Sequence, residues 1–234
     1  MDRSRLLGSA VANNAAWCDA VCRSHGHPGT FGSRLWVSPR HRLRLYPHAI
    51  TLRPDITVPE VLASATPGPF SVKDSFGRLD LTSKGFGLLA EARWIVRDSA
   101  PDGQPDDSPP WEKATSPAEL AGWETAWSGG SGDGPVFRPD LLADPRCAVL
   151  ACRRDGVVAA GAIVYASDGA TGISNVFSAA LSPDRLWAGV QRAAADLWPR
   201  QPLVGYEQGA DLEAARLARF RVLAPLRIWG RPPQ

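Results

Sequence analysis

One hairpin constrains the fold of this chain more than any other feature of its sequence. Two apolar runs, at 148–153 and 157–165, flank the tripeptide Arg-Asp-Gly at 154–156. Asp-Gly between two apolar runs is typical of a tight turn that joins adjacent antiparallel strands. A further apolar run at 171–177 predicts a third strand. We therefore expect the centre of the chain to form a set of neighbouring strands.

Helices are expected to connect the strands that follow this hairpin. Apolar residues recur at helical spacing after Ser182, and short apolar runs then alternate with a second helical segment. The elements predicted downstream are a helix at 182–197, a strand at 203–206, a helix at 212–218 and a strand at 221–229. Hairpins followed by helical crossovers predict a mixed, mostly antiparallel sheet flanked by helices, which is an α/β (α+β) fold.

The first part of the chain has a less regular pattern. An acidic, proline-rich segment at 98–110 is the best internal boundary, and it predicts an N-terminal extension at 1–90 and a second part at 91–234. A long surface loop within one domain is the alternative. Lys73 and Asp74 are candidates for lining a pocket between the two parts. The elements predicted before the hairpin are a helix from Asn13 to Gly26, strands at 48–53 and 88–96, a strand and turn at 70–81, and helices opened by capping boxes at 57–65 and 116–127.

The composition is that of a soluble globular protein. Hydrophobic residues make up 44% of the 234 residues and charged residues 21%, and the formal net charge is +2. The first residues contain no apolar run typical of a signal peptide, and no segment approaches the roughly 18 apolar residues of a membrane helix. Four cysteines do not make a disulfide framework in a chain of this length. We therefore expect a cytoplasmic protein that has no contact with a membrane.

The second part resembles the GNAT superfamily of N-acyltransferases over residues 91–231. The resemblance rests on the order of the elements, on the hairpin AVLACRRDGVVAAGAIV, and on the closing stretch GADLEAARLARFRVLAPLRIWG, in which a helix, Arg-Phe and a strand follow one another. The family usually has Gly-Phe at this point, and Arg219 stands in the place of the glycine. The resemblance implies an enzyme that moves an acyl group, with acetyl favoured, from acyl-CoA to the amine of a small molecule or peptide.

The resemblance also implies where the acyl-CoA binds. In the family it lies in a gap between the third strand of the set and the strand after the long helix. The end of the third strand, at Ser174, Asn175, Val176 and Phe177, would then pair with the pantetheine arm. Arg185 would lie at the pyrophosphate, because the N-terminus of a helix presents free N–H groups and a positive dipole end.

Two positions depart from the family pattern. The glycine-rich phosphate loop is absent, because the segment 174–188 contains no glycine and Asp184 places a negative charge in the first turn of the helix. Ala215 stands where family members carry a tyrosine that acts as general acid. The acid is therefore assigned to Tyr206, and the base that deprotonates the amine is assigned to Glu207.

Other functions fit the same residues. A GNAT-like fold that has lost acyl-CoA would serve as a binding or interaction protein, and the glycine-free loop favours this alternative. An acyltransferase that uses aminoacyl-tRNA would approach through the basic, aromatic loop 38–48, although a nearly neutral chain disfavours a nucleic-acid partner. Cys18, Cys22, His25 and His27 are the candidate metal ligands, but their spacing is tighter than the usual zinc pattern. We expect a buried thiol pair and no metal.

Overall fold

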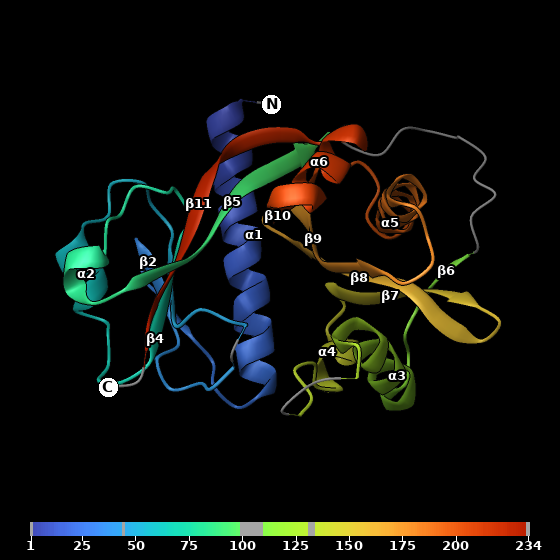
Figure 1. Ribbon diagram of the computed structural model, residues 1–234, viewed down its shortest axis with the longest axis horizontal. Coiled ribbons are helices and arrows are strands. Elements are labelled where there is room, and N and C mark those ends of the chain that lie inside the picture. The colour runs from blue at the N-terminus through green and yellow to red at the C-terminus, as the bar shows by residue number, and fades with distance from the viewer. Residues whose placement is uncertain (1, 44, 99–109, 131–133, 233–234) are drawn as a thin grey trace.

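The computed structural model describes residues 2–43, 45–98, 110–130 and 134–232, and these residues form one eleven-stranded sheet (Figure 1). The strands are β1 (Thr30–Phe31), β2 (Leu35–Val37), β3 (Ala49–Thr51), β4 (Phe70–Asp74), β5 (Gly87–Arg97), β6 (Trp111–Lys113), β7 (Cys147–Arg154), β8 (Val157–Ser167), β9 (Ala170–Ser178), β10 (Leu203–Glu207) and β11 (Arg221–Arg231). Their order in the sheet is β1-β2-β3-β4-β11-β5-β10-β9-β8-β7-β6. The pairs β3–β4 and β9–β10 are parallel and the others are antiparallel, which confirms the predicted fold class.

Helices cover both faces of this sheet (Figure 1). They are α1 (Arg3–Ser24), α2 (Val58–Leu62), α3 (Pro117–Ser128), α4 (Asp140–Ala143), α5 (Pro183–Leu197) and α6 (Gly209–Leu217), with a short 3₁₀ helix η1 (Thr82–Lys84). Helices α1, α3 and α4 share one apolar core with β7 and β8, whereas α5 and α6 share another on the opposite face. We call these two sides of the sheet the α1 face and the α5/α6 face.

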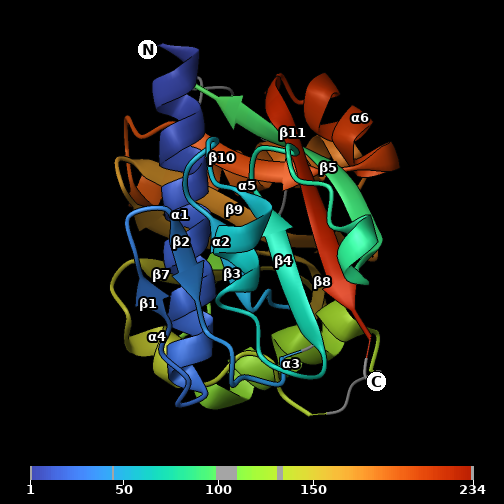
Figure 2. The same cartoon turned by 90° about the vertical axis from the view of Figure 1, so that its left-hand side faces the viewer.

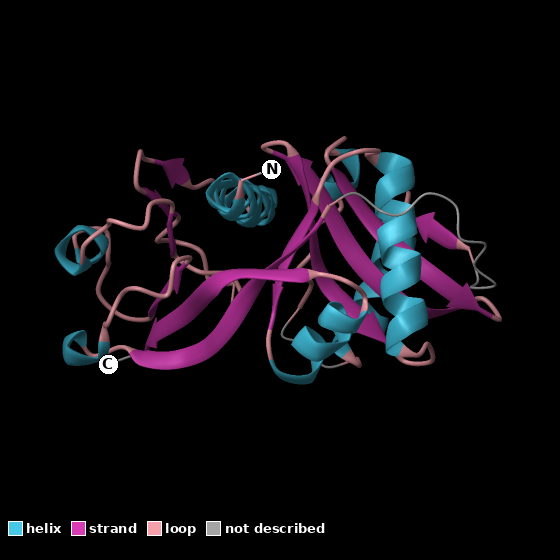
Figure 3. Ribbon diagram, turned by 90° about the horizontal axis from the view of Figure 1, so that it is seen from above, coloured by secondary structure: helices cyan, strands magenta, loops and turns pink. Residues whose placement is uncertain are grey.

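The first 90 residues continue the same sheet. Strand β4 pairs antiparallel with β11, and β11 pairs antiparallel with β5, so the N-terminal strands reach the C-terminal ones through backbone hydrogen bonds. Figure 2 shows β4 beside β11, and Figure 3 shows the long strands β5 and β11 running from one half of the sheet into the other. Most of the predicted boundary at 98–110 lies outside the described residues, so the division of the chain at residue 90 stays a prediction.

The hairpin turn and both capping boxes are formed as predicted. Asp155 and Gly156 have φ values of 52° and 78°, as a two-residue hairpin turn with two left-handed positions requires. The backbone N–H of Glu119 donates to Ser116 Oγ at 3.3 Å, which completes the second capping box at the start of α3. Thr57 N donates to the Glu60 carboxylate at 2.7 Å in the first capping box.

Helix α1 begins at Arg3, and the prediction that Asn13 caps it is wrong. Asn13 is 1% exposed in the middle of the helix, and its Nδ2 donates to the carbonyl oxygens of Tyr165 at 2.8 Å and Ala170 at 3.1 Å. Asparagine usually favours helix ends because its side chain competes for nearby backbone groups. Here those hydrogen bonds are made to the sheet, so the residue is compatible with the helix interior.

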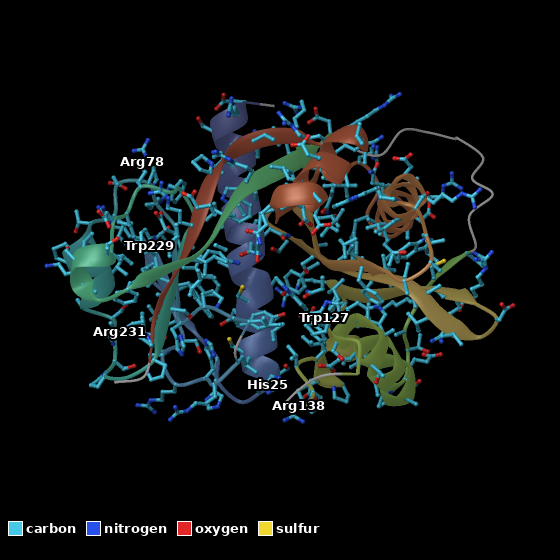
Figure 4. The ribbon with its side chains drawn as sticks, viewed as in Figure 1. His25, Arg78, Trp127, Arg138, Trp229 and Arg231 are labelled. Atoms are coloured by element: carbon cyan, nitrogen blue, oxygen red, sulfur yellow. The ribbon has the colours of Figure 1, made fainter. Side chains whose placement is uncertain are left out.

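The cysteines are buried, as the thiol-pair interpretation predicts. Cys18 and Cys22 are free thiols in α1, and burial raises the pKa of both. His25 instead contacts the loop after α3, with Nε2 2.8 Å from the carbonyl oxygen of Val136 and Nδ1 3.4 Å from Arg138 (Figure 4). Within the described residues no group of three metal-ligating side chains comes together, and no helix there is long and apolar enough to cross a membrane.

Arg219 has a backbone conformation that favours glycine. Its φ is 67°, in the left-handed region, and Phe220 N then donates to the carbonyl oxygen of Ala215 at 3.0 Å to close the end of α6. A residue with a Cβ atom is strained by about 1–2 kcal/mol in this region.

Arg219→Gly is therefore expected to raise the free energy of unfolding by about 0.5–1 kcal/mol, because the relief of strain exceeds the added flexibility of the unfolded chain. Arg216→Gly is the matched control, since this arginine lies within α6, where glycine costs about 1 kcal/mol. Chemical denaturation measures both. A loss of stability in both variants would show that Arg219 is not strained.

The basic loop 38–48 is partly folded into the protein. His41 is 2% exposed and stacks on His48 with ring centroids 4.4 Å apart. Its Nδ1 accepts from Leu43 N at 3.1 Å, and its Nε2 lies 3.1 Å from the carbonyl oxygen of Pro47. Burial lowers the pKa of His41 from 6.5 to about 4, despite the hydrogen bond to Pro47.

The stability of the protein is expected to fall as the pH drops from about 6.5 toward 4. The unfolded chain binds a proton on His41 in this range and the folded chain does not, so the difference at about pH 5 amounts to about 2 kcal/mol relative to pH 8. Denaturation curves of wild type and His41→Gln over this pH range measure the effect. An equal change caused by His27→Gln, at an exposed histidine, would contradict it.

Candidate active site

Strands β9 and β10 part after two residue pairs. Leu203 pairs with Thr171 and Val204 pairs with Gly172, and no further pairs join the two strands. Beyond this point β9 bulges at Asn175, whose φ is 53°. The facing edges of the two strands therefore form a gap that a ligand is able to bridge with backbone hydrogen bonds.

Two glycines set the geometry where the strands part. A Cβ atom on Gly205 would lie 2.9 Å from the carbonyl oxygen of Ile173, so β10 approaches β9 closely only because this residue has no side chain. A Cβ atom on Gly172 would lie 2.0 Å from Asn13 Oδ1. Helix α1 therefore packs directly on the backbone of β9 beside the gap.

The residues predicted to line the gap on β9 differ in their surroundings. Ser174 lines a small cavity on the α1 face, and Asn175 donates to Ser174 Oγ at 3.1 Å and hydrogen-bonds the buried Tyr46. Val176 packs into the core of the α5/α6 face. Phe177 points into the opposite core, where its ring lies edge-on to Trp123 with centroids 5.2 Å apart. The side chains of Val176 and Phe177 therefore support the fold, and only their backbone is available to a ligand.

The two residues predicted to be catalytic lie on opposite faces of β10. The Tyr206 ring meets Trp94 edge-on at 5.5 Å on the α1 face. Successive side chains of a strand alternate, so Glu207 faces α6, where Asp211 is its nearest titratable neighbour. The structure therefore does not bring the predicted acid and base together.

The pKa of Glu207 is strongly raised. Burial, and to a smaller extent the negative charge of Asp211, raise its pKa from 4.5 to about 7. A carboxyl group with this pKa exchanges protons readily near neutral pH, which suits a general acid or base.

A polar cluster on the α1 face joins the two parts of the chain at the gap. We call Asn14, Cys18, Tyr46, Lys73 and Tyr206 the Tyr206 cluster. Lys73 Nζ donates to Asn14 Oδ1 at 2.8 Å and to Tyr206 Oη at 3.2 Å. Of the two pocket candidates in β4, Lys73 reaches this site, whereas Asp74 accepts backbone N–H groups of the turn that follows.

The cavity beside the Tyr206 cluster is small. Its volume is ≈ 10 Å³, which is room for about one water molecule. Asn13, Asn14, Trp17 and Ser174 are among the residues that line it. An acyl group that enters the gap has to widen this cavity.

The loop before α5 uses its own donors internally. Ser178 Oγ accepts the N–H groups of Leu181 at 2.7 Å and Ala180 at 3.3 Å, and Ala179 N donates to the carbonyl oxygen of Ala159 at 2.9 Å. These N–H groups are the ones that a phosphate loop would present to a ligand. The predicted absence of such a loop therefore has a structural counterpart.

Arginine side chains lie at the same helix end. Arg185 in the first turn of α5 and Arg154 at the end of β7 line a cavity of ≈ 230 Å³ together with Ser182. The N–H groups of Asp184 and Arg185 have no acceptor within the helix, as in any first turn. The side chains at this helix end therefore carry two positive charges, from Arg154 and Arg185, and one negative charge from Asp184 in the first turn.

Sequence comparisons find no related protein, whereas the fold has close counterparts. No family model matches the chain, and no curated protein matches it in sequence. A GCN5-related N-acetyltransferase from Kribbella flavida has a TM-score of 0.64 and 15% identity, with 96% of each chain covered. A GNAT-family protein from Novosphingobium aromaticivorans has a TM-score of 0.59 and 12% identity, with 96% of this chain and 99% of that chain covered.

A GCN5-related N-acetyltransferase from Sphaerobacter thermophilus also matches, with a TM-score of 0.55 and 10% identity over 97% of this chain and 94% of that chain. The chain therefore has the fold of the GNAT N-acetyltransferases over nearly its full length. The resemblance noted in the sequence from residue 91 onward extends, at the level of the fold, through most of the first 90 residues as well.

The raised pKa of Glu207 predicts that Glu207→Gln stabilises the protein at high pH. The folded protein holds a proton on Glu207 between about pH 4.5 and 7, so this residue's contribution is present at low pH and is lost as the pH rises through 7. After a discount for partial exposure, we expect the variant to gain about 2 kcal/mol at pH 8 and almost nothing below pH 4.5. Denaturation curves at the two pH values, with exposed Glu213→Gln as control, measure the difference; equal effects at both values would contradict it.

Proposed function

We propose that this protein is an N-acyltransferase that moves an acyl group, acetyl in the simplest case, from acyl-CoA to the amine of a small molecule or peptide. The observation that carries this proposal is the gap between β9 and β10, which lies in a GNAT fold and has titratable groups on both sides. The amine attacks the thioester directly, so no covalent enzyme intermediate is needed. The protein contributes positioning, proton transfer and hydrogen bonds to the developing oxyanion.

Glu207 moves the protons in this proposal. It takes a proton from the attacking amine and returns it to the sulfur as the carbon–sulfur bond breaks, and a pKa of about 7 suits both transfers. We propose that Tyr206 is a hydrogen-bond donor and not the general acid that the sequence predicts. Its ring lies on the α1 face, whereas α5, whose N-terminus is proposed to bind the phosphates, lies on the opposite face.

The phosphates of the acyl-CoA are proposed to bind Arg185 and Arg154. Both arginines line the cavity at the N-terminus of α5, and side chains there replace the backbone donors that Ser178 occupies. Charge-assisted hydrogen bonds from arginine to phosphate are strong and geometrically specific. Ser174 and Asn175 supply backbone groups to the pantetheine arm.

Acetyl-CoA is expected to stabilise the protein against unfolding by about 3 kcal/mol at a hundred times its dissociation constant. Arg185→Ala should weaken binding by about tenfold, because one charge-assisted contact is lost. Asp184→Asn should strengthen binding, because a repulsive charge is removed. Thermal denaturation with and without acetyl-CoA measures the stabilisation, and calorimetric titration measures the affinity of the two variants, with Arg53→Ala at an exposed position as the control. Unchanged affinity in both α5 variants would contradict phosphate binding at this helix.

A second function has support from the loop before α5. A GNAT-like binding protein that has lost acyl-CoA does not need free backbone N–H groups in this loop. The N–H groups of Ala179, Ala180 and Leu181 are all hydrogen-bonded within the protein. The absence of any stabilisation by acetyl-CoA or longer acyl-CoA would favour this function. Stabilisation by aminoacyl-tRNA and not by acyl-CoA would favour an acyltransferase that takes its acyl group from aminoacyl-tRNA, approached through the basic loop 38–48.

A further inference from the structure

Lys73 is a buried cation without an anionic partner. It is 2% exposed at the centre of the molecule, and within the described residues no carboxylate forms an ion pair with it. Burial of a charge is costly unless other groups compensate for it. Its hydrogen-bond acceptors are the neutral groups Asn14 Oδ1 and Tyr206 Oη.

The buried thiol and the buried phenol near Lys73 hold their protons at neutral pH. Burial raises the pKa of the Cys18 thiol, and the same cause raises that of the Tyr46 phenol well above its ordinary value. The Asp19 carboxylate pairs with Arg23 at 2.8 Å and accepts from Trp36 Nε1 at 3.1 Å, so its contacts are to these residues and not to Lys73. Burial is the largest influence on the pKa of Lys73 and lowers it, but the interactions with Tyr206 and Cys18, which include the hydrogen bond to Tyr206, outweigh burial and raise this pKa above its ordinary 10.5. The ammonium therefore keeps its charge.

In the hydrogen bond between Lys73 and Tyr206, only Lys73 is able to be the donor. An ammonium group donates hydrogen bonds and accepts none, so Tyr206 Oη is the acceptor at 3.2 Å. The hydrogen of Tyr206 is then left to donate elsewhere, and within the described residues no acceptor takes it. The same ammonium lies 4.4 Å from the centre of the Tyr206 ring, so it contacts both the hydroxyl oxygen and the ring of this tyrosine.

We propose that Lys73 is a positioning residue that orients Tyr206 as a hydrogen-bond donor to the carbonyl oxygen of the acyl group in the gap. This inference rests on the proposed function. As the bond between the amine nitrogen and the carbonyl carbon forms, the carbonyl oxygen gains negative charge, which the Tyr206 O–H stabilises. When the carbon–sulfur bond breaks, the negative charge passes from the carbonyl oxygen to the sulfur, and Tyr206 keeps its proton throughout.

The positive charge of Lys73 acts through this hydrogen bond. A cation next to the phenol oxygen polarises the O–H bond and makes it a stronger donor. Lys73 reaches the site from β4, which belongs to the first 90 residues. The N-terminal part is thereby required for the reaction at the C-terminal gap, through a residue that makes no contact with the substrate.

The first experiment is kinetic. Tyr206→Phe should lower kcat by about 10²–10³-fold, as the loss of one oxyanion donor does, and Lys73→Met should lower it by at least about tenfold. The double variant should be no slower than Tyr206→Phe alone, because Lys73 acts only through Tyr206. KM for acetyl-CoA should stay nearly constant. Lys84→Met, at an exposed lysine, is the matched control.

The second experiment does not depend on activity. The chain has three tyrosines, so the ionisation that is missing in Tyr206→Phe identifies Tyr206 in a near-ultraviolet titration. Removal of a cation at this distance should move that ionisation to higher pH by about one unit or more in Lys73→Met and in Lys73→Gln. The Lys73→Gln variant keeps a hydrogen-bond donor without the positive charge, so it provides the titration result if Lys73→Met does not fold.

Four outcomes separate the two proposals. An unmoved Tyr206 ionisation in both Lys73 variants would overturn the inference, as would a double variant whose losses multiply. If the Lys73 variants shift the ionisation of Tyr206 but the wild-type protein transfers no acyl group, the proposed function and the role of Tyr206 as an oxyanion donor are overturned. A shifted ionisation together with non-additive kinetics supports both.

Discussion

One buried amide holds helix α1 against the sheet, and the site depends on that contact. Asn13 donates from α1 to carbonyl oxygens at the turn between β8 and β9, and Gly172 leaves no side chain to keep the helix away. The next residue along the helix, Asn14, is thereby brought to Lys73 and Tyr206. Removal of a buried hydrogen-bond partner leaves several backbone acceptors unpaired, which costs more than the bond itself contributes. The position of α1 is therefore fixed at the point where β9 and β10 part.

Strand β10 divides the chemistry between the two faces of the sheet. On the α5/α6 face, burial and to a smaller extent Asp211 raise the pKa of the half-buried Glu207 to about 7, whereas on the α1 face Tyr206 contacts the ammonium of Lys73. A thioester in the gap between the strands would meet both groups. Arg185 at the start of α5 lies on the same face as Glu207, so the mechanism that we propose places phosphate binding and proton transfer on one side of the sheet and oxyanion binding on the other.

The sequence predicted local elements well because their signals are local. The Asp-Gly turn and both capping boxes act within a few residues, and the structure has all three. Asn13 misled the prediction of α1 because its partners lie far along the chain. The opposite orientation of Tyr206 and Glu207 follows from strand alternation and was accessible to prediction. The place of Lys73 was not, because it depends on the pairing of β4 with β11.

The most direct test of the central claim is a crystal structure of the protein with an unreactive thioether analogue of acetyl-CoA. The pantetheine arm is predicted to lie between β9 and β10, hydrogen-bonded to the backbone at Ser174 and Asn175, with the acyl oxygen near Tyr206 Oη and the phosphates at Arg185. An analogue bound elsewhere on the protein, with the two strands unchanged and Tyr206 untouched, would contradict the assignment of the gap as the acyl-transfer site.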